Sequence, residues 1–315
     1  MIPAHPYEAY THCLLCPRAC GADRSSGKTG VCGETATLRI ASLEAHFGEE
    51  PPISGSCGSG TLFFSGCTLL CTFCQNYQIS GLHLGVDATV AAMAARILDL
   101  ARQQHIHNLN LVTPDHFLPH VIDLVTQLRS RGFDLPVVFN SSGYEKVEML
   151  RWAETCVDIY LPDYKYSDAE LAHTLSRCRN YPAVALDALA EMVRQKGFLD
   201  HFTEGRPLAS RGVLVRHLVL PGQVANSVDA LSSLFAEFGQ DLPLSLMSQY
   251  RPARMVRQAE LNRTLRPEEF YRVYEHALEL GFRNMFVQHM AGSQTEEDPF
   301  LPDFDRERPF KGNVR

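Results

Sequence analysis

Residues 65–76 read Ser-Gly-Cys-Thr-Leu-Leu-Cys-Thr-Phe-Cys-Gln-Asn, and they follow the apolar run 61–64, Thr-Leu-Phe-Phe. The run predicts a buried strand, so Cys67, Cys71 and Cys74 would lie in the loop that follows it. Three thiolates at this C-x3-C-x2-C spacing can hold three irons of a [4Fe–4S] cube and leave the fourth iron open. A zinc loop is the weaker interpretation, because no fourth Cys or His lies within a few residues of the triplet.

The composition is that of a globular protein with a large core, since 45% of the 315 residues are hydrophobic. A formal net charge of −7 argues against nucleic acid as a main partner, because phosphate binding needs an excess of Lys and Arg. No apolar run is long enough to span a bilayer, and the first residues do not resemble a signal peptide. We therefore expect a cytoplasmic protein whose ten cysteines do not form a disulfide framework.

Beyond residue 60, short apolar runs alternate with amphipathic segments. The expected strands are 61–65, 108–112, 136–139, 157–161, 213–220, 244–247 and 284–287. The expected helices are 87–104, with Asp87 as N-cap, 117–131, 145–154, segments up to 197, 228–238 and 267–280. This alternation predicts an α/β fold with a parallel sheet, either a partial barrel or a doubly wound sheet. Six or seven units fall short of the eight that close a full barrel.

Three regions differ in composition. Residues 1–60 form a cysteine-rich segment with little helical periodicity, residues 61–295 carry the strand–helix alternation, and residues 296–315 form a charged tail expected on the surface. Eight of the ten cysteines lie within the first 74 residues, which indicates metal chemistry at that end.

The N-terminal segment contains a second group of thiols: Cys13, Cys16, Cys20 and Cys32. Such density in a loop-rich stretch predicts one metal site, because small segments of this kind need a metal to fold. Zinc and a second iron–sulfur cluster both suit four thiolates, and the spacing does not separate them. The other cysteines, at positions 57, 156 and 178, are expected to be a loop residue and two buried, inert thiols.

Polar residues follow each expected strand, where the active sites of parallel barrels lie. Besides the triplet they include 113–116, 140–144, 163–165 and 248–252. Arg216 and His217 alternate on one strand, so at most one faces the cavity, and His217 is equally well a packed core histidine. His116, Gln249 and His289 are further candidate substrate contacts.

The triplet, with Phe73 before its last cysteine, resembles the signature of radical S-adenosylmethionine (SAM) enzymes. Asn-Ser-Ser-Gly at 140–143, Asp163-x-Lys165 and the motif at 215–222 are similar to the activating enzymes of glycyl radical enzymes, such as pyruvate formate-lyase-activating enzyme. The nearest subgroup begins with an extra cysteine segment. The resemblance covers roughly residues 61–250 and implies a partial (β/α)6 TIM-like barrel.

The resemblance also implies positions for the cofactor. Phe73 and Asn76 would lie near the adenine, Asn140, Ser141 and Asp163 near a monovalent cation, Lys165 near the SAM carboxylate, and Arg216 beside the cofactor. Simpler alternatives exist: residues 140–143 suit a turn, and Asp163 with Lys165 suits a surface ion pair. The family's Gly-Gly-Glu is replaced by Val-Thr-Pro-Asp at 112–115, so Thr113 or Asp115 would have to contact the SAM amino group.

The activity implied is reductive cleavage of SAM at the [4Fe–4S] cluster to a 5′-deoxyadenosyl radical, which abstracts hydrogen from a substrate. No catalytic residue beyond the cluster ligands is assigned. The substrate would be a glycine of a partner protein, a peptide or a small molecule, and the reductant a flavodoxin or ferredoxin. An iron–sulfur electron-transfer protein and a zinc-stabilised scaffold are the alternatives from other functional classes.

Overall fold

The computed structural model describes residues 5–288, 301–306 and 308–310. Its centre is a set of parallel strands that run in chain order. They are β2 Ser59–Phe64, β4 Leu109–Val112, β5 Val137–Ser141, β6 Ile159–Pro162, β7 Gly212–Val213, β8 Val215–Leu218, β9 Leu244–Met247 and β10 Met285–Val287. Every strand expected from the sequence is present within a few residues of its predicted position.

The expected strand 213–220 is interrupted. β7 pairs with β6, whereas β8 pairs with β9, and only Leu214 separates the two short strands. A parallel bridge between Asp163 and Arg216 continues the pairing across the break. The two sheets are therefore consecutive parts of one parallel arrangement.

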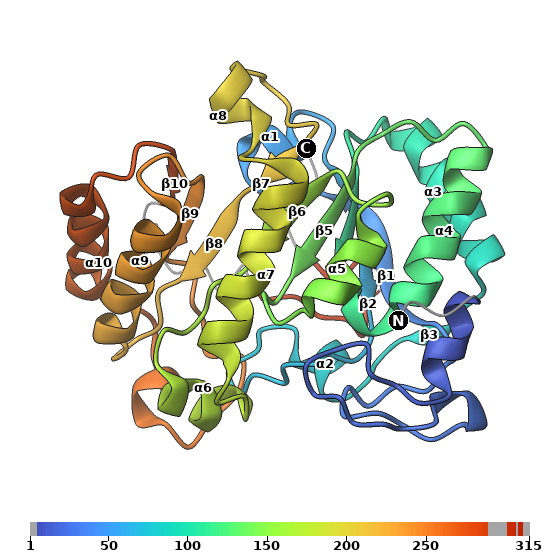
Figure 1. Cartoon of the computed structure of the whole chain (residues 1–315), viewed down its shortest axis with the longest axis horizontal. Coiled ribbons are helices and arrows are strands. Elements are labelled where there is room, and N and C mark those ends of the chain that lie inside the picture. The colour runs from blue at the N-terminus through green and yellow to red at the C-terminus, as the bar shows by residue number, and fades with distance from the viewer. Residues whose placement is uncertain (1–4, 289–300, 307, 311–315) are drawn as a thin grey trace.

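The helices between the strands lie side by side in the same order, α3 on α4, α4 on α5, α5 on α7 and α9 on α10 (Figure 1). Their bounds are α3 Val90–Gln104, α4 Leu118–Ser130, α5 Val147–Ala153, α6 Ala169–Ser176, α7 Tyr181–Lys196, α9 Val224–Phe238 and α10 Pro267–Leu280. Because the strand order never reverses, right-handed crossovers place these helices on one face of the sheet. This winding is that of an open barrel and excludes the doubly wound alternative.

Two helix starts were predicted wrongly: α9 begins at Val224 and not at 228, and α3 has a different N-cap from the expected one. The N-cap of α3 is Thr89, whose hydroxyl accepts a hydrogen bond from the Ala92 amide at 3.2 Å. Asp87 instead ends the short strand β3 Val86–Asp87 and forms an ion pair with Arg39. Both residue types cap helices well, so propensity alone does not choose between them.

Two strands outside the parallel set were not predicted. β1 Arg39–His46 pairs antiparallel with β2 and with β3, so the sheet extends into the segment before residue 60. The remaining elements are short: α1 Pro51–Ser54, α2 Tyr77–Ser80, α8 Asp200–Glu204 and 3-10 turns at Pro6–Tyr10, Arg24–Ser26, Asp115–Phe117 and Ala259–Asn262.

Two arginines, the half-buried Arg18 and the buried Arg24, fix the N-terminal segment to the rest of the protein. The Arg18 guanidinium donates to the carbonyls of Thr68, Leu69, Ser176 and Arg177 at 2.6–3.1 Å. Arg24 is 1% exposed, donates to the His116 carbonyl at 2.6 Å and lies 4.5 Å from the Tyr10 ring centroid. The segment thus packs through long-range contacts despite having little regular structure.

Among the described residues of the tail, Phe304 packs edge-on against Phe63 of β2 and Phe310 stacks on it, each with ring centroids 5.4 Å apart. Phe304 is buried by this contact. None of the described helices has the length and apolar character that crossing a membrane requires.

His217 makes stability depend on pH. It is fully buried, with Nδ1 2.6 Å from the Tyr164 carbonyl and Nε2 2.9 Å from the Ser227 hydroxyl. Burial lowers its pKa from 6.5 to about 4, so only the unfolded chain gains this proton between those pH values. We expect the free energy of unfolding to fall as pH drops from 6.5 to 4, by up to about 1.4 kcal/mol per pH unit.

Urea unfolding across this pH range measures the effect. The free energy of unfolding should change less steeply with pH in His217→Gln than in the wild type. It should change as in the wild type in a control, His173→Gln, whose histidine is exposed. Equal slopes in the wild type and in His217→Gln would contradict the assignment.

Candidate active site

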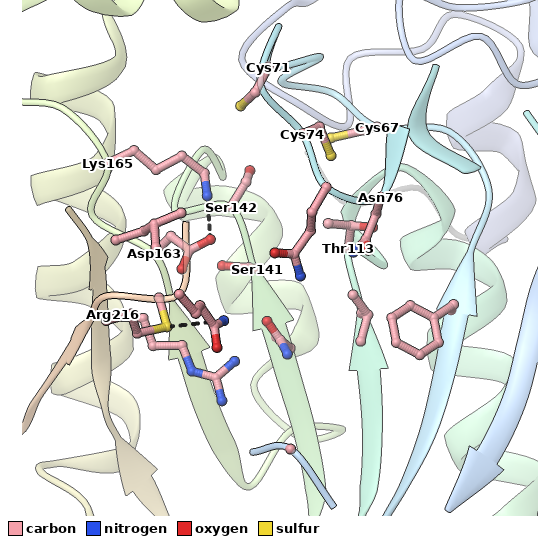
Figure 2. Close-up of a pocket in the computed structure, with 18 of the residues that line it drawn as sticks. Cys67, Cys71, Cys74, Asn76, Thr113, Ser141, Ser142, Asp163, Lys165 and Arg216 are labelled. Carbon is pink, nitrogen blue, oxygen red and sulfur yellow. Dashed lines mark hydrogen bonds and ion pairs between the residues drawn. The ribbon is translucent and has the colours of Figure 1, made fainter. Parts of the chain in front are cut away.

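A cavity of about 420 Å³ receives side chains from β1, β2, β4, β5, β8 and β9 and from the loops that follow the strands, including the loop after β6. Figure 2 shows the cysteines at one end, Arg216 at the other, and Asp163, Lys165, Ser141 and Thr113 between them. The lining includes all ten residues that the sequence proposed around the triplet: Cys67, Cys71, Phe73, Cys74, Asn76, Asn140, Ser141, Asp163, Lys165 and Arg216. Residues up to 149 positions apart in the chain therefore share one space.

Each sulfur of the triplet accepts a hydrogen bond. The Leu69 amide lies 3.4 Å from Cys67 Sγ, the Ser176 hydroxyl 3.1 Å from Cys71 Sγ, and the Ser80 hydroxyl 3.4 Å from Cys74 Sγ. Leu70 adopts a left-handed backbone conformation, with φ at 56°, which turns the loop between the first two cysteines. Donors of this kind stabilise thiolates and tune the potential of a bound cluster.

The donor set suits an iron–sulfur cube better than a single ion. In the described part of the chain, no three Cys, His, Asp or Glu side chains form a group that could hold one metal ion. A cube of four irons separates its thiolates more widely than one ion does, so this finding does not count against a cluster. Burial, with Asp115 and the other thiols, raises the pKa of Cys67, and cluster binding would therefore release its proton.

Asn76 offers an unused acceptor to the cavity. Its Oδ1 is buried and has no hydrogen-bond partner among the described residues, although Asn76 precedes α2 at the N-cap position. A buried polar atom without a partner is rare and points to a missing ligand or water. Phe73 lies in the same wall, 6.2 Å from the Tyr250 ring centroid.

Asp163 and Lys165 form an ion pair in the cavity wall rather than on the surface, with side chains 23% and 19% exposed. Burial alone would lower the pKa of Lys165, but Asp163 and Cys71 outweigh it and the pKa rises. The ammonium is therefore charged at neutral pH and lies near the thiols. The Tyr181 hydroxyl donates to the Asp163 carbonyl at 2.9 Å and accepts from the Lys165 amide at 3.0 Å, which fixes the loop.

The ends of β4 and β5 supply strained and buried groups. Thr113 lines the cavity with φ at 51°, an unusual value for a β-branched residue and one associated with functional sites. Ser141 donates to Glu145 Oε2 at 3.1 Å. Burial and the nearby Asp115 raise the pKa of Glu145 well above its ordinary value. Asp115 itself accepts from the Thr68 hydroxyl at 2.8 Å and does not line the main cavity.

Arg216 pairs with two acids that the sequence analysis missed. Its guanidinium donates to both carboxylate oxygens of Glu50 and to Glu49, and all three side chains are at most 10% exposed. Glu49 and Glu50 precede α1, in the segment read as cysteine-rich loop. An arginine in an apolar strand was itself a signal, because a buried charge needs a partner.

The two histidine candidates that the structure describes do not line the cavity. His217 and His116 are buried elsewhere, the latter with Nε2 2.7 Å from the Ser65 carbonyl. Gln249 lines the cavity, 2.9 Å from the Gln288 side-chain nitrogen. His289 lies outside the described residues.

The N-terminal thiols lie close to the loop that carries Cys67, Cys71 and Cys74. The Cys67 amide donates to the Cys32 carbonyl at 3.3 Å. A Cβ atom built on Gly30 would lie 3.3 Å from Cys32 Sγ and 3.5 Å from Cys20 Sγ, so these sulfurs flank a bare glycine. Arg24 Nη1 is 3.7 Å from Cys13 Sγ, and Cys16 is buried. All ten cysteines are free of disulfides, and the second metal site stays a prediction.

Comparisons with known proteins agree with the iron–sulfur prediction. Residues 53–176 match the family model described as a 4Fe-4S single cluster domain, and this range contains the triplet. The chain is also 26% identical over 277 residues to an uncharacterized protein of Methanocaldococcus jannaschii, covering 86% of this chain and 74% of the relative.

The sequence similarity to solved structures is weaker than the similarity to this relative. SuiB of Streptococcus suis, bound to S-adenosylmethionine, aligns with a TM-score of 0.45 and 11% identity over 71% of this chain and 48% of its own. Methylornithine synthase aligns with a TM-score of 0.45 and 13% identity over 70% of this chain and 60% of its own. The chain thus spans less than two thirds of each of these proteins.

Proposed function

We propose that this protein is a radical SAM enzyme with a partial (β/α)6 barrel. The observation that carries the proposal is the placement of Cys67, Cys71 and Cys74 in one cavity with polar residues from the strand ends, within a segment that matches a 4Fe-4S single cluster domain. Cys67, Cys71 and Cys74 would hold a [4Fe–4S] cluster, which, once reduced by an external donor, would supply the electron that cleaves SAM to methionine and a 5′-deoxyadenosyl radical.

The chain's own residues bind and orient the cofactor. Lys165, charged and beside the thiols, suits the SAM carboxylate, and Thr113 suits the amino group in place of the family's Gly-Gly-Glu. Asn76 Oδ1 would accept from the adenine amino group, with Phe73 against the ring. The apolar and aromatic parts of the wall exclude water, which keeps a radical from being quenched.

Two further sites belong to the proposal. Asn140, Ser141 and Asp163 would surround a monovalent cation near Lys165. Cys13, Cys16, Cys20 and Cys32 would bind zinc or a second cluster, and the absence of a single-ion group among the described residues favours the cluster. The buried Arg24 supports a metal site here, because it pairs with no carboxylate among the described residues and lies against Cys13. Thiolates on a metal would supply the anion that a buried guanidinium needs.

The partners follow the sequence resemblance. A flavodoxin or ferredoxin would reduce the cluster in the cytoplasm. A glycine of a partner enzyme is the hydrogen donor that the similarity to activating enzymes suggests, and a pull-down from an anaerobic lysate would test for such a partner.

Anaerobic reconstitution with iron and sulfide, followed by dithionite and SAM, tests the activity. We expect 5′-deoxyadenosine and methionine in equal amounts. Redox-active iron without SAM cleavage would instead favour the electron-transfer alternative, and zinc without iron in anaerobically purified protein would favour the scaffold.

A further inference from the structure

Exposed arginines lie on two sides of the loop 67–74, which carries the three cysteines. On one side, the Thr72 amide donates to the Leu175 carbonyl of α6 at 2.8 Å, and Arg177 at the C-cap of α6 is exposed. On the other side, the Arg254 side chain donates to the Thr72 carbonyl at 3.2 Å. The end of α6 and the loop that follows β9 therefore meet the cysteine loop at one residue.

The charges on these two segments are predominantly positive. Residues 168–179 and 251–263 contain six arginines and three acids, although the whole chain has a net charge of −7. The acids already serve as a helix cap or in ion pairs: Asp168 at the start of α6, Glu170 with Arg179, and Glu260 with Arg263. Arg177, Arg254 and Arg257 are exposed and form no ion pair with another described residue.

An apolar side chain lies among these charges. Met255 is 81% exposed, more than any other large hydrophobic residue that the structure describes. Its neighbour Arg254 lies over the Tyr77 ring, 5.4 Å from the centroid. Methionine and arginine are enriched where proteins bind one another, and methionine adapts its shape to a partner. The name arginine patch is used below for four residues: Arg177, Arg254, Met255 and Arg257.

An acidic electron-carrier protein is the partner that these features fit. The proposed function requires an external donor of single electrons, and a carrier docked here would lie against the loop that holds the cluster. We infer that the arginine patch is the docking surface for such a carrier. Its acidic side chains would pair with the arginines, and complementary charge speeds protein association. In each encounter the carrier loses one electron and the cluster gains it.

Calorimetric titration of the reconstituted chain with an acidic flavodoxin measures docking without SAM cleavage. We expect the double variant Arg177→Glu/Arg257→Glu to weaken flavodoxin binding at least about tenfold. High salt should weaken binding by the wild type more than binding by the variant, because salt screens exposed charges. Arg254 is left unchanged because it contacts the loop itself.

The matched control is Arg96→Glu/Arg131→Glu, which makes the same change in net charge. Both arginines are exposed and form no ion pair with another described residue. They belong to α3 and to the C-cap of α4, which Figure 1 shows on the other side of the molecule from α6. Flavodoxin binding should be unchanged in this control. Absence of binding by the wild type, or equal losses in the two double variants, would overturn the inference.

Two rates of 5′-deoxyadenosine formation separate docking from chemistry. With reduced flavodoxin as the donor, Arg177→Glu/Arg257→Glu should be at least about tenfold slower than the wild type, in line with its weaker binding. With dithionite, which is small and needs no docking surface, the two should have equal rates. Equal slowing with both donors would mean that the arginines act on the cluster, and the docking surface would be refuted.

The inference rests on the proposed function because that function supplies the need for a carrier. The two fail in different ways. A wild type that cleaves no SAM with dithionite refutes the proposed function, and the titration with flavodoxin still decides whether the arginine patch binds the carrier.

Discussion

Replacing Cys71 by alanine is expected to abolish both cluster loading and 5′-deoxyadenosine formation. Each thiolate of the triplet holds one iron, so two remaining thiolates leave a second iron without a protein ligand. Cys71 Sγ also accepts a hydrogen bond from the Ser176 hydroxyl, and the Tyr166 hydroxyl lies 4.0 Å from the same sulfur. Alanine would therefore leave both hydroxyl groups without this acceptor. Iron content, the cluster absorbance and the yield of 5′-deoxyadenosine after anaerobic reconstitution measure the effect.

The matched control is Cys156→Ala. Cys156 is also a free cysteine, but it is buried beside Thr155, away from the cavity. Its loss should reduce stability slightly and leave iron content and SAM cleavage unchanged. Full cleavage of SAM by Cys71→Ala would defeat the assignment of the triplet.

The second large effect is expected for Gly143→Ala. Gly143 has φ at 77°, and a Cβ there would lie 2.0 Å from the Asp163 carbonyl oxygen and 3.0 Å from the Tyr181 hydroxyl. The main chain of Asp163 would have to move, and Lys165 would move with it. We expect a loss of about 4 kcal/mol or more in the free energy of unfolding, together with loss of SAM binding.

Gly132→Ala separates this clash from the cost of the backbone conformation. Gly132 has φ at 81°, but a Cβ there meets nothing within 4 Å. The substitution should therefore cost only about 1 kcal/mol, the penalty of a left-handed conformation. Denaturant unfolding of both variants measures the difference, and equal losses would argue against a close approach at Gly143.

The elements of the fold were predictable because each depends on a local pattern. Apolar runs gave the strands, and the helix at Pro267–Leu280 matched its prediction at both ends. The order of the strands in the sheet was not predictable, because right-handed crossovers occur in both an open barrel and a doubly wound sheet. β1 was missed because its pairing with β2 depends on tertiary contacts in a segment dominated by cysteine and glycine.

In the candidate site, too, the residues set by local sequence patterns were predictable and those set by long-range contacts were not. The triplet and the strand-end residues were predictable because the chain places them after strands whose ends converge. Glu49 and Glu50 were not, because Arg216 lies 167 and 166 residues later and no local spacing joins them. Arg216 was correctly expected at the cavity, but only the structure reveals which acids neutralise it.

The anchoring of Arg18 bears on how the protein is made. The carbonyls of Ser176 and Arg177 that bind its guanidinium are synthesised 158 and 159 residues after it. At 5–20 residues per second this delay lasts about 8–30 s, during which the nascent N-terminal thiols lack that anchor. At the proposed second metal site, metal loading and oxidative damage would compete before translation is complete, so oxygen exposure during expression should matter more than exposure of the finished protein.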